Sequence, residues 1–299
     1  MKVRVGFGLG TTTAAGGPNG FASLVDALER HRFDSLWLSE RVTGGAVDPV
    51  VGLSVAAGRT QKLKLGFSVL VLPGRNPVLL AKELASLDLL SNGRLLPAFG
   101  LGVADPNEQQ AFGVERSERA ARFDEALPLL RRLWWEESVD HDGRFFSYKG
   151  VTVRPKPVSK MEVWLGGRAP SELRRVGRLG DGWLPSFCTP AEAAEGRAVV
   201  EAAAADAGRS IDPEHYGALV IYNRGGGPLP ERLAQLVTLR RPDTDPSEVI
   251  PSGTVELRRQ LERFVDVGFS KFVVVPAGDP PSWDDEIADL AADVLPIQN

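Results

Sequence analysis

The chain has 299 residues, and 43% of them are hydrophobic, so it can bury a large core as one domain over residues 1–299. Lysine and arginine number 35 against 39 aspartates and glutamates, which gives a net charge of −4. This balance offers no basic face for nucleic acid and favours a small-molecule partner.

Leader, membrane and metal signals are lacking. Met1 leads directly into an apolar run, without a charged and then apolar leader, and no uncharged run reaches the ~18 residues of a membrane helix. We therefore expect a cytoplasmic protein without a membrane partner. Cys188 is the only cysteine, and the three histidines lack ligand spacing, so we expect no metal site and a buried structural thiol.

Short apolar runs alternate with longer amphipathic runs along the chain, as they do in repeated βα units. Eight strands are predicted, at residues 3–10, 35–39, 63–72, 95–101, 162–166, 182–187, 216–222 and 271–276. Between them, apolar residues recur with a period near 3.6, which predicts helices that each turn one face to the sheet. The pattern favours an α/β fold, a (β/α)₈ TIM barrel with insertions, although a doubly wound sheet would share it locally.

Two segments interrupt this alternation. Residues 141–154 contain Asp142-Gly143 between apolar positions and predict a hairpin or an extended excursion. Residues 223–253 carry three successive glycines and a polar stretch after the seventh strand. Because βα connections shape the active site of a barrel, this second segment is a candidate lid, and an incidental surface insertion is the alternative.

Glycines cluster at the ends of the first and fourth strands, at Gly8 and at Gly100 and Gly102 among others. Neither run fits a dinucleotide-binding fingerprint, because Thr11 and Asp105 stand where the third glycine is required. We expect these three glycines to leave room for a planar cofactor ring against the backbone. The alternative is that packing inside a barrel demands small residues there.

A second glycine pair, Gly166-Gly167, closes the fifth strand and is followed by Arg168. Pro170 suits the first turn of the next helix. Free backbone amides at such a helix start, together with the guanidinium of Arg168, predict a phosphate site. An ordinary strand-to-helix turn is the alternative.

Glu40 ends the second strand, where barrel enzymes place catalytic groups. It continues the alternating face of Leu36 and Leu38, which suggests that its carboxylate projects into a site. An ion pair with the neighbouring Arg41 that merely closes the loop is the alternative.

Two further residues are candidates on position alone. Glu108 is a second carboxylate, in the polar stretch after the fourth strand, and is a catalytic candidate there, although most such glutamates are solvated. Trp183 lies on the sixth strand, where cofactor stacking competes with ordinary core packing as its role.

The order and spacing of these motifs resemble the bacterial luciferase-like superfamily, which contains flavin monooxygenases and deazaflavin-dependent oxidoreductases. The resemblance covers most of the chain. It rests on residues 33–40, 73–77, 91–94, 100–102 with Glu108, 122–127, 163–167 and 180–183.

The resemblance implies that Glu40 lines the ring pocket and that Gly166 and Gly167 form the phosphate-binding turn. It also implies a cis peptide bond between Ser68 and Val69, which would support the cofactor ring. The family further suggests homodimerisation through barrel helices.

One departure from the family pattern concerns the reaction. Luciferases and deazaflavin-dependent sugar-phosphate dehydrogenases usually have histidine directly after the strand-two acid, and here it is Arg41. Proton abstraction from an alcohol by that histidine is therefore excluded, which argues against a simple alcohol-dehydrogenase mechanism.

The resemblance is stronger to the deazaflavin-dependent branch, and Arg168 can meet the carboxylates of a lactyl-glutamate tail. The leading interpretation is an oxidoreductase that moves hydride between C5 of coenzyme F420 and an unidentified small organic substrate. The alternatives are an FMN-dependent monooxygenase and a flavin-binding protein without turnover.

Overall fold

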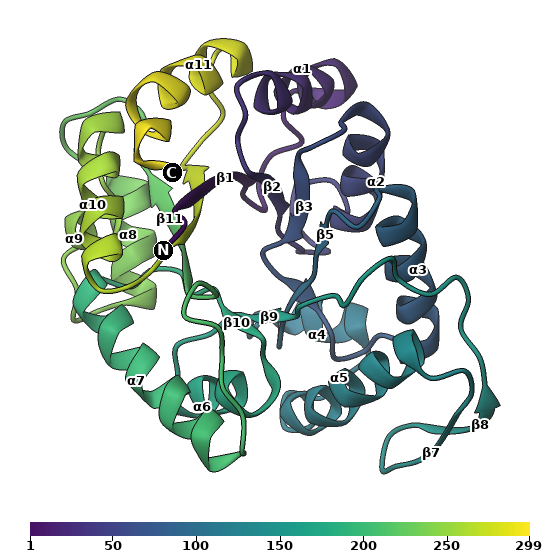
Figure 1. Cartoon of the computed structure of the whole chain (residues 1–299). Coiled ribbons are helices and arrows are strands. Elements are labelled where there is room, and N and C mark those ends of the chain that lie inside the picture. Colours follow the sequence, from purple (N-terminus) through teal and green to yellow (C-terminus); the bar gives the residue numbers. More distant parts are fainter.

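The computed structural model describes all 299 residues, and Figure 1 shows its strands at the centre of a ring of helices. All pairings between the central strands are parallel, in the orders β11-β12-β1-β2-β3-β5 and β10-β9-β6-β4. The central strands are β1 (Arg4–Leu9), β2 (Ser35–Leu38), β3 (Lys64–Phe67), β4 (Leu70–Val71), β5 (Leu95–Leu96), β6 (Ala98–Gly100), β9 (Trp164–Leu165), β10 (Gly182–Trp183), β11 (Gly217–Tyr222) and β12 (Lys271–Pro276).

The two sheets are parts of one closed ring. Strands β3 and β4 are successive parts of the third predicted strand, and β5 and β6 are successive parts of the fourth. Parallel bridges from Trp183 to Tyr216 and from Ser186 to Leu219 connect β10 with β11 and complete the circle. The fold is therefore the (β/α)₈ barrel that the sequence predicts, with all eight predicted strands in place.

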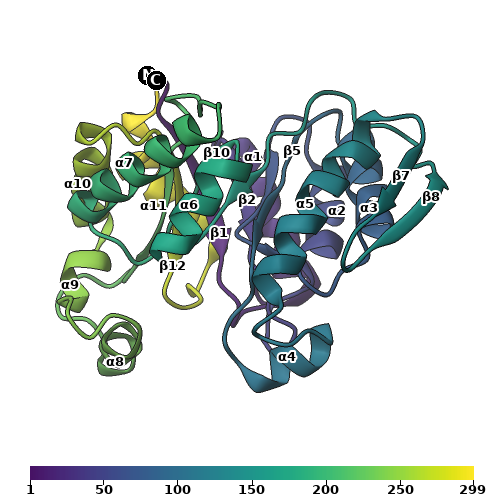
Figure 2. The same cartoon turned by 90° about the horizontal axis from the view of Figure 1, so that it is seen from below.

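Helices follow the strands and cover the outside of the barrel (Figures 1 and 2). They are α1 (Gly17–Arg30), α2 (Pro49–Arg59), α3 (Pro77–Leu90), α4 (Pro106–Phe112), α5 (Arg119–Trp135), α6 (Pro170–Leu179), α7 (Pro190–Asp206), α8 (Glu231–Arg240), α9 (Pro246–Val249), α10 (Thr254–Asp266) and α11 (Trp283–Asp293), with a final 3₁₀ turn at Leu295–Ile297. None of the helices combines the length and the apolar character needed to span a bilayer.

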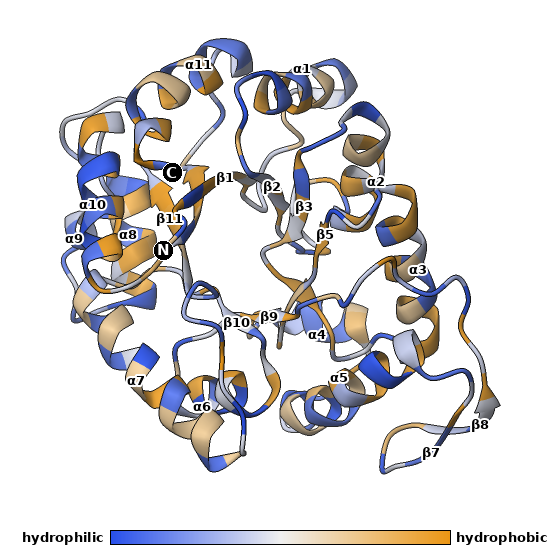
Figure 3. Ribbon diagram, in the orientation of Figure 1, coloured by the Kyte–Doolittle hydropathy of each residue, from blue (hydrophilic) through white to orange (hydrophobic).

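The helices are held by apolar faces that the 3.6-residue period predicts. In α1, Phe21, Leu24, Val25 and Leu28 are buried against the barrel, and Pro18 occupies the first turn. Each such side chain contributes roughly 1.5–3 kcal/mol by leaving water. In Figure 3 the strands near β11 are hydrophobic, and the helices combine hydrophobic and hydrophilic stretches.

Two tryptophans fill the interior of the barrel, and glycines on neighbouring strands make room for them. A Cβ atom at Gly66 would collide with the ring of Trp37, and one at Gly182 would lie 2.5 Å from Cδ2 of Trp164. Both tryptophans belong to an inner apolar cluster with Val273, separate from the larger core between strands and helices. The barrel is thus packed with side chains along its axis.

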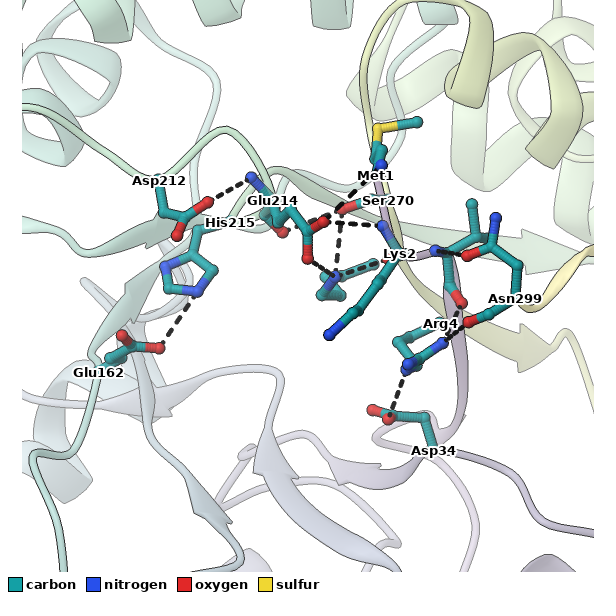
Figure 4. A network of polar contacts seen from close by, with 12 residues as sticks. Met1, Lys2, Arg4, Asp34, Glu162, Asp212, Glu214, His215, Ser270 and Asn299 are labelled. Carbon is teal, nitrogen blue, oxygen red and sulfur yellow. Dashed lines mark hydrogen bonds and ion pairs between the residues drawn. The ribbon is translucent and has the colours of Figure 1, made fainter.

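The end of the barrel nearest the termini carries a polar network (Figure 4). Glu214 accepts a hydrogen bond from the Lys2 amide at 2.9 Å and lies 3.7 Å from the Lys271 ammonium. The Val3 amide donates to the side chain of Asn299 at 3.0 Å. This network ties the first strand to the last residues of the chain.

The two predicted interruptions are both present as distinct structures. The first contains an antiparallel hairpin, β7 (Val139–Asp142) and β8 (Ser147–Val151), as predicted. The second, residues 223–253, contains helices α8 and α9. Cys188 is 6% exposed, which confirms the buried thiol.

Candidate active site

The carboxyl ends of the strands lie on the face opposite the termini. Figure 2 shows helices α4 and α8 projecting from that face, at some distance from the chain ends. Catalytic groups of (β/α)₈ barrels occupy this face, because the βα loops converge there.

Val69 lies between two of the predicted glycines. A Cβ atom at Gly100 would lie 2.5 Å from Cγ2 of Val69, and one at Gly166 would lie 3.3 Å from Cγ1. The Ser68–Val69 peptide bond is cis, which confirms the expectation drawn from the resemblance. The structure thus brings together Ser68, Val69, Gly100 and Gly166, which come from three different strand ends.

The end of β2 fastens the cis segment through successive hydrogen bonds. The Ser39 hydroxyl donates to the Ser68 carbonyl at 2.9 Å and lies 3.1 Å from the Ser68 hydroxyl. The Glu40 amide donates to the Val69 carbonyl at 3.2 Å. Sequence reasoning missed Ser39, although its alternation with the inward-facing Trp37 was the signal that could have found it.

Glu40 has other partners than the sequence suggested. Its carboxylate accepts a hydrogen bond from the Val71 amide at 2.6 Å and forms an ion pair with Arg75, and the side chain is 5% exposed. Burial raises the pKa of Glu40, against the opposing effect of Arg75 and of the Val71 amide. Leu38, on the alternating face that Glu40 was expected to continue, packs toward Gly52 of α2 and not into the barrel.

Arg41 turns toward α4. Its guanidinium lies 3.1 Å from Asp105 and 3.9 Å from Glu108, so the alternative of a Glu40–Arg41 ion pair is wrong. Glu108 is 4% exposed and accepts hydrogen bonds from the Thr43 amide at 2.8 Å and the Thr43 hydroxyl at 2.6 Å. Although burial opposes ionisation, these hydrogen bonds hold the pKa of Glu108 below its ordinary value. Glu108 therefore fastens the loop after β2.

The predicted phosphate turn has its expected shape, but its amides are not free. Gly167 adopts a φ of 102°, which favours glycine, and α6 begins with Pro170 in its first turn. The amides of Arg168 and Ala169 both donate to one carboxylate oxygen of Glu172, each at 2.9 Å. The expectation of unengaged amides is therefore corrected, because an internal carboxylate caps the helix start.

Trp183 is hydrogen-bonded to this turn through its side chain. Its side chain is 2% exposed and packs against Gly196 of α7, and its indole N–H donates to the Gly167 carbonyl at 2.9 Å. The ring of Trp183 is therefore packed in the core, which was the alternative to cofactor stacking. Its only connection with the predicted phosphate turn is the hydrogen bond to the Gly167 carbonyl.

The two remaining glycines differ in their surroundings. A Cβ atom at Gly8 would lie 2.8 Å from side-chain carbons of both Val273 and Val275, so packing inside the barrel accounts for that glycine. Gly102 has a φ of 78° and lies in a loop held by Arg119. One Arg119 nitrogen donates to the carbonyls of three successive residues, 101–103, at 2.9–3.2 Å. Sequence reasoning missed Arg119, for which no local pattern gave a signal.

The candidate lid, residues 223–253, is attached to the chain segment that follows β10. Arg241, directly after α8, donates to the Phe187 carbonyl and forms an ion pair with Glu192 at the start of α7. The Arg240 guanidinium lies over the Phe187 ring, 5.1 Å from its centroid. A small apolar cluster of Val237, Val249 and Ile250, with Phe187 packed against it, holds α8 and α9 together at this place.

The residues at this face fit a flavin-type cofactor by their shape and charge. Gly100 and Gly166 leave room for the side chain of Val69, and all three residues are partly exposed, so Val69 offers an apolar contact for a planar ring. The turn at Gly167 lies at a helix start, but its Arg168 and Ala169 amides hold the Glu172 carboxylate. A cofactor phosphate beside Gly166 and Gly167 would therefore be held by the guanidinium of Arg168, and by the amides only if Glu172 moved away.

Known proteins share the sequence and the fold. Residues 3–223 match the model of the family described as luciferase-like monooxygenase. An F420-dependent glucose-6-phosphate dehydrogenase from Segniliparus rotundus is 32% identical over 206 residues, which are 65% of this chain and 60% of that protein. A phthiodiolone/phenolphthiodiolone dimycocerosates ketoreductase from Mycobacterium sp. (strain JLS) is 36% identical over 165 residues, 54% of this chain and 43% of that protein.

The fold comparison extends over the whole chain. The solved structure of an F420-dependent secondary alcohol dehydrogenase, in complex with an F420–acetone adduct, has a TM-score of 0.83 at 18% identity and covers 100% of both chains. At this identity the likeness concerns the fold alone. Because the family model spans the chain from β1 to the end of β11, the protein belongs to the luciferase-like monooxygenase family.

Proposed function

We propose that the protein is an F420-dependent oxidoreductase that acts on a small organic substrate held over the deazaflavin ring. The observation that carries this proposal is the partly exposed side chain of Val69 between Gly100 and Gly166, with Arg168 two residues after Gly166. The printed activities of two sequence relatives, a dehydrogenase and a ketoreductase, support the reaction class, and one of their names specifies F420.

In this proposal the bound deazaflavin supplies the hydride-accepting or hydride-donating carbon C5. The chain's own residues orient it: Val69 supports the ring, and Gly166, Gly167 and Arg168 hold the phosphate. Ser39 and Glu40 act as positioning residues, because their hydrogen bonds fix the segment that carries Val69. Glu108 positions the loop after β2 in the same way.

The base for an alcohol substrate is not a histidine in this proposal. His141 lies 3.1 Å from Glu125 near the β7–β8 hairpin, and His215 lies 3.2 Å from Glu162 at the opposite end of the barrel. Arg41 stands where the family pattern has histidine, and its guanidinium is paired with Asp105 and Glu108. With an alcohol substrate the hydroxyl proton would pass to water, and with a carbonyl substrate water would supply the proton.

An FMN-dependent monooxygenase is the second candidate, because the family is described by that activity and FMN also ends in a phosphate. Oxygen consumption separates the two reactions, because a reduced flavin forms a productive peroxide with oxygen and a reduced deazaflavin does not. A flavin-binding protein without turnover would bind the cofactor and show no redox activity on a broad substrate panel.

A parallel titration with F420 and FMN, followed by tryptophan fluorescence, tests the cofactor. We expect F420 to bind more tightly, and preferential saturation by FMN would overturn the choice. Arg168→Ala should weaken binding by about one to two orders of magnitude if the contact to phosphate is direct, since a charge-assisted hydrogen bond contributes roughly 1.5–3 kcal/mol. Unchanged affinity would show that Arg168 does not contact the phosphate.

A further inference from the structure

We propose that Phe187 and Ile221 form an apolar wall that binds the alkyl or aryl group of an uncharged carbonyl substrate. This inference rests on the proposed function and names the substrate class of the same site. In the reducing direction, the carbonyl carbon accepts hydride from C5 of reduced F420 and the carbonyl oxygen accepts a proton from water. The products are the alcohol and oxidised F420.

Ile221 joins two apolar clusters near the carboxyl end of β11. Together with Val69, it packs against the inner apolar cluster of the barrel. It also packs against the small cluster of the candidate lid, to which Val237 of α8 belongs. The Ile221 side chain is nevertheless partly exposed. An apolar surface therefore extends from the surroundings of Val69 to the lid, without leaving the face where the strands end.

Phe187 continues this surface from the segment after β10. Its side chain packs against the same lid cluster as Ile221 and is partly exposed. The Arg240 guanidinium lies over its ring at 5.1 Å, and its carbonyl accepts a hydrogen bond from Arg241. The ring is thus held in place by α8 and by the residue after it, while part of it can contact a ligand.

The backbone at Phe187 is in an unfavourable conformation. Its φ is 52°, in the left-handed region, which a bulky side chain rarely adopts. Among the four non-glycine residues with a positive φ, Phe187 is the only aromatic one. Such conformations persist only where their surroundings impose them, and they are concentrated at ligand-binding and catalytic sites. This second observation is independent of the apolar packing and points to the same residue.

The wall contains no charged side chain of its own. Two further members of it, Leu229 and Leu233, are partly exposed leucines that pack against the lid cluster. The neighbouring Arg241 is already paired with Glu192. A carboxylate or phosphate on this surface would lose water without gaining a partner. An alkyl chain would gain about fourfold in affinity for each methylene group that it buries.

The experiment compares three ketones. 2-Nonanone carries a long alkyl chain, 8-oxononanoate has the same chain ending in a carboxylate, and acetone has no chain. Turnover is measured as kcat/KM with reduced F420. Binding is measured separately by calorimetry on the complex with oxidised F420, in which a ketone cannot react.

The variants are Phe187→Ala, Phe187→Leu and Phe187→Gly, with Phe145→Ala as the matched control. Phe145 is also partly exposed and also has a guanidinium over its ring, that of Arg122 at 4.5 Å. It lies between the strands of the β7–β8 hairpin. The control therefore removes an equivalent aromatic contact at another place on the molecule.

We expect the parent to prefer 2-nonanone over both other ketones by about 10- to 100-fold in kcat/KM. Phe187→Ala should weaken the binding and turnover of 2-nonanone by about 10- to 100-fold, and those of acetone by less than about threefold. Phe187→Leu should retain most of the activity, and Phe145→Ala should match the parent. The affinity for F420 should stay within about twofold in all variants.

Phe187→Gly separates substrate binding from folding. Glycine removes the ring as alanine does, but it also removes the unfavourable φ. We therefore expect Phe187→Gly to melt above Phe187→Ala and to lose 2-nonanone to the same extent. If both variants instead weaken F420 and the three ketones equally, Phe187 only holds the lid in place, and the inference is wrong.

The two proposals fail in different ways. If F420 does not bind the parent, the proposed function is wrong and this inference falls with it. If F420 binds but 8-oxononanoate or acetone is used as well as 2-nonanone, the apolar substrate class is wrong while the proposed function stands. The same conclusion follows if F420 binds and calorimetry detects no binding of 2-nonanone to the complex.

Discussion

The carboxylate of Glu40 binds Arg75, thirty-five residues further along the chain, and not Arg41 beside it. Because the same carboxylate accepts the Val71 amide, the ends of β2 and β4 are joined at one buried side chain. Val69 precedes Val71 and Arg75, the two residues that the Glu40 carboxylate binds. Its position therefore depends on an ion pair that is distant in sequence.

Replacement of Glu40 by glutamine should lower the affinity for the cofactor, because the segment that carries Val69 loses a charged attachment. The amide keeps the size and an acceptor for Val71 but removes the charge opposite Arg75, and because burial raises the pKa of Glu40 and so offsets this ion pair, we expect only a small change in unfolding free energy. Double-mutant cycles in chemical denaturation measure the coupling energy between Glu40 and each of the two arginines. Strong coupling of Glu40 to Arg75, with none to Arg41, is expected, and the reverse would contradict the arrangement.

Glu108 should make stability depend on pH on the acid side. Its pKa is lowered in the folded protein, so the unfolded chain binds more protons between that lowered pKa and the ordinary value of about 4.3. Stability is therefore fully present above that window and decreases as the pH falls through it. Melting temperatures of the parent and Glu108→Gln at pH 7 and pH 4 test this: the variant should melt lower at pH 7 and lose less on acidification.

Trp183→Phe should weaken cofactor binding several-fold, because it removes the N–H group that holds the Gly167 carbonyl and keeps most of the buried ring. Trp134→Phe is the matched control, since the Trp134 indole also donates to a backbone carbonyl, that of Ala81 at 3.2 Å, far from the turn. Each variant should lose about 0.5–1.5 kcal/mol of stability from the hydrogen bond. Equal cofactor affinity in the two variants would show that Trp183 has no specific role in cofactor binding.

Gly66→Ala should destabilise the barrel by about 1–3 kcal/mol or more, because the added methyl group meets the ring of Trp37 in the packed interior. Gly58→Ala, in α2, provides the contrast, since nothing lies within 4 Å of its Cβ position. That variant should be up to about 1 kcal/mol more stable, as alanine favours the helix. Urea denaturation of both variants measures whether their changes in unfolding free energy have the expected opposite signs. A neutral Gly66→Ala would mean that the interior tolerates displacement of Trp37.

Homodimerisation through the barrel helices stays a prediction of the family resemblance. Sedimentation velocity at micromolar concentration would test it.

The sequence by itself determined the barrel, because its signals are local and repeated. Apolar runs with intervening 3.6-residue periods located the eight strands and the helices, and Pro170 marked the start of α6. The cis bond at Ser68–Val69 followed from the position of those two residues in a recognisable family pattern. Each of these features depends on neighbours within a few residues or on the order of motifs.

Only the tertiary structure decided the partners of the charged residues. The partner of Glu40 is Arg75, the amides of Arg168 and Ala169 are capped by Glu172, and Arg240 of α8 lies beside Phe187. Alternation along β2 predicted that Glu40 shares a face with Leu38, but it did not say whether that face turns to the helices or to the barrel axis. A charge pairs with whichever opposite charge the folded backbone brings within reach, and that distance is set by the closure of the barrel and not by separation in the sequence.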